Sequence, residues 1–514
     1  MVADTRQRKQ IGGSMERSSG IFLHITSLES PHGIGTLGEC AYRFADFLKR
    51  AGQSYWQILP LGVTGYGDSP YQPYSSFAGN PLLIDLDMLV EEGLLMPADL
   101  ETLPPVRDAA SVDYDAVRDS RRQLLLTAYR RSGTTVRRAV QAFAAEQADW
   151  LSDYSLYMAL KERYGGGSWQ DWPEPVRLRQ RKALEDAARE LADEAGFHDF
   201  LQYLFFRQLH ALKTYVNDLG IRLIGDLPIY SSEDSADVWA HPELFALNED
   251  LRASHISGVP PDYFSPDGQL WGNPLYNWPA HKATKYEWWM KRIGALRRCA
   301  DVVRIDHFRG FWNYWCVPAG AATAKEGTWR FGPGMNFVRA IQSTFPDVPV
   351  IAEDLGLLSA GARSFVRDSG YPGMNVLQFS FNATRPASGA PHTFSENSVC
   401  YTGTHDNTTS LAWYREISNA DRAHAKRYMG LNEEEGPVRG LIRSGMASAS
   451  RLFIAPMQDW LELDAEARMN TPGTVGCNWQ WRMLPGQRSG QLAADIRRVT
   501  RTFGRIPKAR RRKR

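Results

Sequence analysis

Short apolar runs alternate with helix-like segments along most of the 514-residue chain. Each run is rich in β-branched or aromatic residues and ends in polar or glycine-rich sequence, which is typical of strands that lead into loops. Eight such runs occur, at residues 20–28, 54–61, 221–230, 301–310, 349–356, 375–381, 398–407 and 452–459. This alternation predicts an α/β fold with a parallel sheet, and eight units predict closure as a (β/α)8 TIM-type barrel.

An open, doubly wound sheet is the alternative fold. Such a sheet would normally carry a glycine-rich phosphate-binding turn after its first strand if it bound a dinucleotide. Residues 31–35, Pro-His-Gly-Ile-Gly, do not form that pattern. The barrel is therefore favoured.

Two insertions into the barrel are expected. Residues 90–196, after the second strand, have the charged, Ala- and Leu-rich pattern of a helical insertion. Residues 231–285, after the third strand, are predicted to form a loop-rich insertion that faces substrate. The catalytic barrel would span 19–505, between a flexible leader (1–18) and a basic, disordered tail (506–514). No β-domain is expected after the eighth strand.

Charge and cysteine content exclude several classes of function. The net charge is +2 and basic residues cluster only near the C-terminal end, which gives no general attraction for nucleic acid. No apolar stretch approaches the length of a membrane span, and residues 1–19 lack the apolar core of a signal peptide. The five cysteines are scattered, without metal-like spacing, as expected in a reducing cytoplasm. We therefore expect a cytoplasmic protein with no nucleic-acid or membrane partner, no metal and no cofactor; no oligomeric state is favoured.

Carboxylates stand at the ends of three predicted strands. Asp306 ends the fourth, Glu353 the fifth and Asp406 the seventh, with Arg304 and His405 beside them. The carboxyl ends of barrel strands form the active-site face of such folds. Each carboxylate alone could be a helix cap or an ion-pair partner. Several like charges on one face cost free energy unless a function uses them, so we predict a catalytic cluster.

Glycosyl transfer is a reaction that needs carboxylates without a metal or a nucleotide loop. Neighbouring strands can hold Asp306 and Glu353 at the separation of about 5–5.5 Å found in retaining enzymes. Arg304 lies two residues before Asp306, so we expect it to share that face and to keep Asp306 ionised. Glu353, beside another carboxylate, is expected to have a raised pKa, as an acid catalyst requires. Strand alternation should point His307 away from Asp306.

Nine short motifs follow one another from residue 59 to residue 482. Together with the first predicted strand, near residue 20, they cover nearly the whole chain. They occupy 59–62, 65–72, 225–230, 258–264, 271–276, 304–310, 352–356, 403–407 and 478–482. In this order they resemble the α-amylase superfamily and, within it, the 4-α-glucanotransferase family, also called amylomaltases or disproportionating enzymes. The chain departs from the family pattern at Asn375 and Thr408, where basic and acidic residues are common.

The resemblance implies retaining transfer of α-1,4-glucan segments, through a covalent glycosyl-Asp306 intermediate, to the 4-hydroxyl of glucose or another α-1,4-glucan. Maltooligosaccharides would be substrates. Asp306 would be the nucleophile, Glu353 the general acid/base and Asp406 the stabiliser of the distorted sugar, assisted by Arg304 and His405. The implied substrate-binding residues are Ser69, Tyr71, Asp226, Asp262, Tyr263, Gln269, Trp271 and Asn478.

Other interpretations remain open at this point. Tyr71 and Trp271 could pack within loops instead of against sugar, and Asn478 could cap a turn. A hydrolase would use the same double displacement, because the choice between water and a sugar acceptor depends on the exclusion of water. A barrel that binds α-glucan without catalysis is the alternative from a different class of function.

Overall fold

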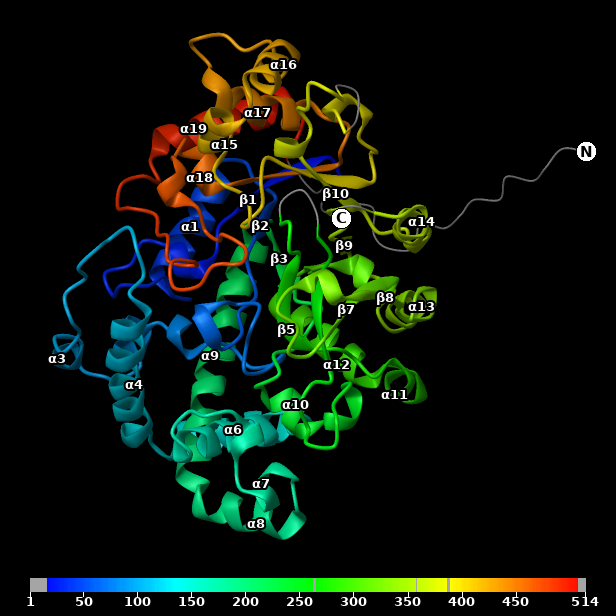
Figure 1. The fold of residues 1–514 in the computed structure, drawn as a ribbon. Helices are drawn as coiled ribbons and strands as arrows, with labels where there is room; N and C mark the ends of the chain where they lie inside the picture. The colour runs from blue at the N-terminus through cyan, green and yellow to red at the C-terminus, as the bar shows by residue number, and fades with distance from the viewer. Residues whose placement is uncertain (1–15, 262–264, 357, 386–388, 507–514) are drawn as a thin grey trace, which may run out of the picture.

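The computed structural model describes residues 16–261, 265–356, 358–385 and 389–506, and a parallel eight-stranded barrel lies at its centre (Figure 1). Its strands are β1 (Ser18–Phe22), β2 (Tyr55–Gln57), β3 (Arg222–Leu227), β6 (Val302–Ile305), β9 (Val350–Ala352), β10 (Gly373–Val376), β11 (Ser398–Tyr401) and β12 (Leu452–Pro456). They follow the order β10-β11-β12-β1-β2-β3-β6-β9. The backbone N–H of Ala352 donates to the carbonyl of Pro372 at 2.9 Å and links the two ends of the sheet. The predicted barrel is confirmed.

All eight barrel strands are shorter than the predicted runs, and two of them are also displaced along the chain. β1 ends at Phe22, because residues Ile25–Ser27 form a 3-10 helix in place of a longer strand. β10 begins at Gly373 and gives way to a 3-10 helix at Leu377–Phe379, so the predicted sixth strand was placed too late. A short apolar run does not by itself separate a strand from an adjoining helical turn.

Helices follow most barrel strands. They include α1 (Glu39–Arg50), α9 (Ala192–Asp218), α12 (Glu287–Cys299), α13 (Met335–Thr344), α14 (Ala360–Ser369), α15 (Ser410–Glu416), α16 (Asn419–Met429), α17 (Gly436–Ala447) and α19 (Gly490–Thr502). Phe44, Phe47 and Leu48 of α1 are fully buried, as the sequence pattern predicts. In the described parts of the chain, no helix combines the length and apolarity needed to cross a membrane.

The helical insertion after β2 is present. It contains α4 (Tyr114–Arg131), α5 (Thr134–Glu146), α6 (Leu151–Arg163), α7 (Glu174–Arg177) and α8 (Arg181–Glu190), and α6–α8 lie at the end of the molecule opposite α16 (Figure 1). The predicted limit at 196 falls inside α9, which continues without a break into the barrel. Glycine lowers the stability of a helix interior, but Gly196 has a local reason: a Cβ atom at this position would come within 2.8 Å of the Tyr129 hydroxyl.

A second sheet, which the sequence did not predict, lies outside the barrel. Its antiparallel strands are β4 (His255–Val259), β5 (Gln269–Pro274), β7 (Asn313–Pro318) and β8 (Thr328–Phe331), in the order β5-β4-β7-β8. The expectation that 231–285 would be loop-rich was wrong for β4 and β5. Both are short and contain glycine, and β4 pairs with β7, which lies beyond the next barrel strand. Local pattern cannot indicate such a distant pairing.

Two arginines fasten the ends of the described chain to the barrel. Arg17 donates to the carbonyls of Met446 and Ser448 at 2.9 Å each. The predicted leader, 1–18, is therefore too long, because Arg17 is anchored and Ser18 begins β1. Arg505 is fully buried and donates to the carbonyl of Ser18 at 2.8 Å and to that of Ser450 at 2.9 Å.

Candidate active site

An arginine and an aspartate face each other across two barrel strands. The register of β3 and β6 places Asp226 opposite Arg304, and Arg304 Nη1 lies 2.6 Å from each Asp226 oxygen. The Tyr71 hydroxyl donates to Asp226 Oδ2 at 2.7 Å. The Asp226 side chain has no exposed surface. A buried charge pair needs such complete partnering, so Asp226 acts as the counter-ion of Arg304.

Asp306 follows β6 at the carboxyl end of the barrel. Its backbone N–H donates to the Leu227 carbonyl at 3.0 Å, which holds the residue beside β3. Its Oδ1 accepts from Arg304 Nη1 at 3.0 Å, so the two side chains do lie on one face, as the sequence predicts. The Asp306 side chain is 26% exposed, and an approaching substrate can therefore reach it.

Glu353 follows β9 and is held by backbone donors. Its own N–H donates to the Ile305 carbonyl at 3.0 Å, which places the residue next to the end of β6. Its carboxylate accepts from the N–H groups of His307 and Leu355, at 2.7 Å each. These bonds fix the orientation of the carboxylate without using a side chain.

His307 lies beyond the strand that the sequence assigned to it. β6 ends at Ile305, and His307 has a left-handed backbone conformation with φ of 46°. Strand alternation therefore cannot determine where the His307 side chain points, and the argument behind that prediction is wrong. The imidazole lies edge-on to the Trp271 ring at 4.9 Å, while the backbone N–H of His307 binds Glu353. This residue thus links Trp271 to the carboxylate cluster.

Three carboxylates surround one guanidinium in this buried region. Burial raises the pKa of Asp306, and the charge of Arg304 opposes the rise. Burial also raises the pKa of Glu353, against Arg304 and the two backbone donors. Arg304 therefore acts in the predicted direction at Asp306 but does not outweigh burial there. We conclude that the Asp306–Glu353 pair retains a proton at pH values above the ordinary pKa range of a carboxyl group. An acid catalyst requires this protonated state.

His405 and Asp406 lie in the loop after β11. His405 stacks on the Tyr71 ring at 5.0 Å with an interplanar angle of 19°, and burial lowers its pKa. Its Nε2 lies 3.3 Å from Asp406 Oδ1. Asn470 donates to the same Asp406 oxygen at 2.6 Å. About half of the Asp406 side chain is exposed (48%), so its other oxygen can receive a ligand.

The structure places the predicted binding residues in different situations. Trp271 is half-buried in β5, where its Nε1 donates to Gln269 Oε1 at 3.2 Å. Ser69 Oγ accepts from the Tyr71 backbone N–H at 3.2 Å, so it shapes the turn before Tyr71. Asp262 and Tyr263 lie outside the described residues.

Two of the predicted sugar ligands are committed to other partners. Asp226 is bound to Arg304 and Tyr71 as described above. Asn478 Oδ1 accepts from the Thr471 N–H at 2.9 Å, and its Nδ2 donates to the Thr474 carbonyl at 2.8 Å. Asn478 therefore closes a turn, which was the alternative interpretation of its sequence position. Tyr71 also differs from a free sugar platform, because His405 covers one face of its ring.

Two residues of the site were missed in the sequence. Asn470 binds Asp406, and its N–H donates to the His405 carbonyl at 3.1 Å. It stands in an irregular segment with no pattern that could have indicated it. Trp479 lies 5.8 Å from both the Tyr71 and the His405 rings. It belongs to the motif at 478–482, so that motif could have indicated it. Within the described ranges, no group of three or more His, Cys, Asp or Glu side chains is arranged to hold a metal ion.

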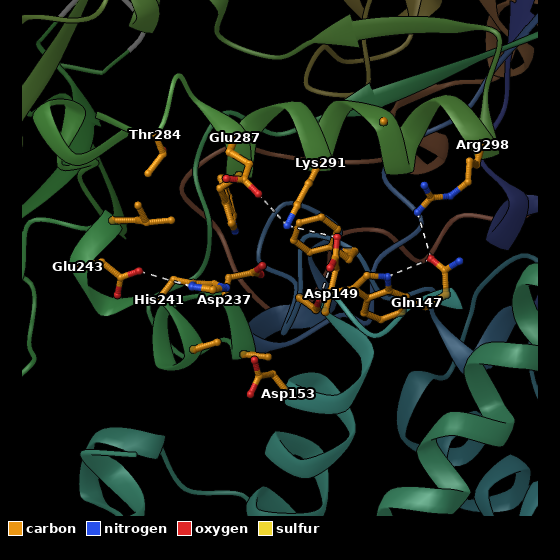
Figure 2. Close-up of a pocket in the computed structure, with 18 of the residues that line it drawn as sticks. Gln147, Asp149, Asp153, Asp237, His241, Glu243, Thr284, Glu287, Lys291 and Arg298 are labelled. Atoms are coloured by element: carbon orange, nitrogen blue, oxygen red, sulfur yellow. Dashed lines mark hydrogen bonds and ion pairs between the residues drawn. The ribbon is translucent and has the colours of Figure 1, made fainter. Parts of the chain in front are cut away.

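A cavity of about 330 Å³ lies elsewhere, between the helical insertion, α10 (Ala236–Ala240) and α12. No predicted site residue lines it. Figure 2 shows Lys291 between Glu287 and Asp149, at 3.1 and 3.2 Å, and Arg298 beside Gln147 at 3.2 Å. The charged groups of this cavity thus pair with one another across the junction of insertion and barrel. The predicted catalytic carboxylates lie elsewhere, at the carboxyl ends of the barrel strands.

Comparison with known proteins agrees with this geometry. The family model described as 4-alpha-glucanotransferase matches residues 23–487. The 4-alpha-glucanotransferase of Thermus thermophilus is 46% identical over 503 residues, covering 96% of this chain and 100% of that protein. The protein of the same name from Streptococcus pneumoniae is 45% identical over 496 residues, covering 96% and 98%. The structure of the amylomaltase from Streptococcus agalactiae in complex with acarbose matches with a TM-score of 0.93 and 39% identity, covering 96% of this chain and 100% of that one.

Proposed function

The chain belongs to the 4-alpha-glucanotransferase family, and on this basis we propose that its site transfers segments of α-1,4-glucan with retention of configuration. Donors would be α-1,4-glucans and maltooligosaccharides, and the acceptor would be glucose or another glucan. The observation that carries the proposal is the cluster in which Arg304 binds both Asp226 and Asp306 while Glu353 is held beside the end of β6. A reactive carboxylate and a protonated one side by side are what double displacement needs.

In the first step, Asp306 attacks the anomeric carbon of the donor. The glycosidic C–O bond breaks as Glu353 gives its proton to the departing 4-oxygen, and a covalent glycosyl ester of Asp306 remains. The leaving glucan departs with a free 4-hydroxyl. Arg304 favours the negative charge of Asp306 before attack and so opposes burial, which raises the pKa of Asp306.

In the second step, the 4-hydroxyl of an acceptor attacks the same anomeric carbon. Glu353, now a carboxylate, takes the hydroxyl proton, and the ester bond to Asp306 breaks. Both carboxyls return to their first states. The half-exposed Asp406, oriented by His405 and Asn470, would bind hydroxyls of the distorted sugar. We also propose a cytoplasmic location, which the five free cysteines support.

Maltotriose should be converted into glucose and longer oligosaccharides with little increase in total reducing ends, because a sugar hydroxyl and not water receives the glycosyl group. Product chromatography together with a reducing-end assay measures both quantities. Water as the acceptor would instead make reducing ends rise steadily as the donor disappears. That result would assign the alternative, an α-glucan hydrolase with the same chemistry.

Substitution of Asp226 by asparagine should lower the pKa of Glu353, because the charge of Asp226 is one of the causes that raise it. Glu353 must be protonated to act, so its active form would be lost at a lower pH. The alkaline limb of the pH–rate profile with maltotriose should therefore move to lower pH by less than about one unit. Asp267→Asn, which removes an exposed carboxylate paired with Lys325, is the control and should leave the limb in place. An unmoved limb in Asp226→Asn would contradict the charge coupling.

A further inference from the structure

Two aromatic side chains stand exposed on one face of β8. Trp329 is 42% exposed and Phe331 is 76% exposed, and alternate residues of a strand share a face. β8 is the terminal strand of the second sheet, where it pairs with β7. Single exposed apolar residues are common on protein surfaces, whereas two rings side by side on one strand are typical of a surface that binds something.

Neighbouring side chains hold these rings in place. The Arg309 guanidinium lies over the Trp329 ring at 4.4 Å, and its Nη2 donates to Asn313 Oδ1 at 3.2 Å. Trp315 meets the Trp329 ring edge-on at 5.0 Å. Trp312 meets Phe331 edge-on at 5.6 Å. Rings fixed in this way lose little conformational entropy when a ligand packs on them.

The exposed rings lie close to the carboxylate cluster. The 3-10 helix Phe308–Phe311 connects Asp306 to β7, and the Phe308 N–H donates to the Glu353 carbonyl at 2.9 Å. Arg309, within that turn, carries the contact onward to Trp329. Phe308 and Arg309 are themselves buried, so the Trp329 ring lies one arginine side chain away from the turn that contacts Glu353.

We propose that Trp329 and Phe331 form a platform for the acceptor chain, in contact with glucose units beyond the one whose hydroxyl Glu353 deprotonates. This inference rests on the proposed function. Glu353 exchanges its proton with the 4-oxygen of the acceptor-side sugar. Glucose units that extend from this sugar towards Trp329 are therefore on the acceptor side. The C–H faces of glucose units are apolar and pack on aromatic rings, while their hydroxyls stay in water. Trp329 and Phe331 therefore favour longer acceptors over glucose.

An acceptor series with a fixed donor tests the platform. α-Maltotriosyl fluoride supplies the glycosyl group and leaves as fluoride, so the donor places nothing on the acceptor side. In Trp329→Ala, kcat/KM for maltotriose and maltotetraose as acceptors should fall about tenfold, the equivalent of one lost aromatic contact, while that for glucose stays within about twofold. Phe331→Ala should give the same pattern, and Trp329→Tyr should keep most of the wild-type preference.

Leu178→Ala removes an equally exposed apolar side chain, 44% exposed, from the helical insertion, and should leave the whole acceptor series unchanged. Equal losses with glucose and maltotetraose, or no loss with either, would overturn the platform while wild-type transfer leaves the proposed function standing. Absence of transfer to every acceptor by the wild type would overturn both. Loss of a wild-type dimer in Phe331→Ala, with acceptor kinetics unchanged, would assign the edge strand to self-association instead.

Discussion

Asp306→Asn should abolish transfer, with a loss of about 10⁴-fold or more in kcat/KM on maltotriose, as is typical when a nucleophile is removed. An amide cannot form the glycosyl ester, and the two other carboxylates near Arg304 are the buried counter-ion Asp226 and the proposed proton donor Glu353. The variant should nevertheless fold. Its Tm should be no lower than that of the wild type, because the substitution removes one of three carboxyl groups gathered around one arginine.

Asp301→Asn is the matched control for this result. Asp301 lies just before β6, where its Oδ2 accepts from the Leu223 N–H at 2.8 Å, far from the chemistry at the other end of the strand. Its substitution should lower Tm while kcat stays within a few-fold. Residual transfer by Asp306→Asn above about 1% of wild type, after exclusion of deamidation by mass spectrometry, would mean that another group is the nucleophile.

Glu353→Gln should lose about 10²- to 10⁴-fold in kcat on maltotriose, the range for a removed general acid. The loss should depend on the leaving group. With α-maltotriosyl fluoride the first step needs little protonation, so it should proceed within about tenfold of the wild-type rate. The second step still lacks its base, and a glycosyl ester on Asp306 should accumulate. Intact-mass and peptide mass spectrometry would detect the adduct.

Two comparisons make the Glu353 experiment specific. The double variant Asp306→Asn/Glu353→Gln should form no adduct, since it lacks the attacking oxygen. Asp354→Asn replaces the neighbouring carboxylate, which accepts from the Met374 N–H at 2.7 Å, and should show no dependence on the leaving group. Equal losses on maltotriose and on the fluoride in Glu353→Gln would show that Glu353 positions groups without transferring a proton.

The barrel and its reactive carboxylates could be predicted because each is a local signal repeated along the chain. Eight apolar runs that end in polar residues indicate eight strands. The spacing of two residues predicts a shared face for Arg304 and Asp306, and the two side chains do meet, although β6 ends at Ile305. The second sheet could not be predicted in this way, because β4 and β7 pair across an intervening barrel strand. Local patterns carry no information on such distant partners.

The environment of each side chain was also beyond the sequence. Asp226 and Asn478 have the chemistry of sugar ligands, yet one neutralises Arg304 and the other closes a turn. Whether a polar group is free to bind substrate depends on neighbours that are distant along the chain, such as Tyr71 for Asp226. The same holds for Asn470, whose role follows only from its contact with Asp406.

The position of β1 has a consequence for how the protein is made. β1 is hydrogen-bonded to β2 on one side and to β12 on the other, although these partners stand near opposite ends of the chain. A ribosome adding 5–20 residues per second would need roughly 20–90 s to synthesise the roughly 430 residues from the end of β1 to the start of β12. During that time the nascent sheet has an open edge that can pair with other chains. Closure must follow translation of β12, and the contacts of Arg505 with Ser18 and Ser450 come later still. Production of this protein should therefore depend on chaperones or slow expression more than the stability of the finished barrel would indicate.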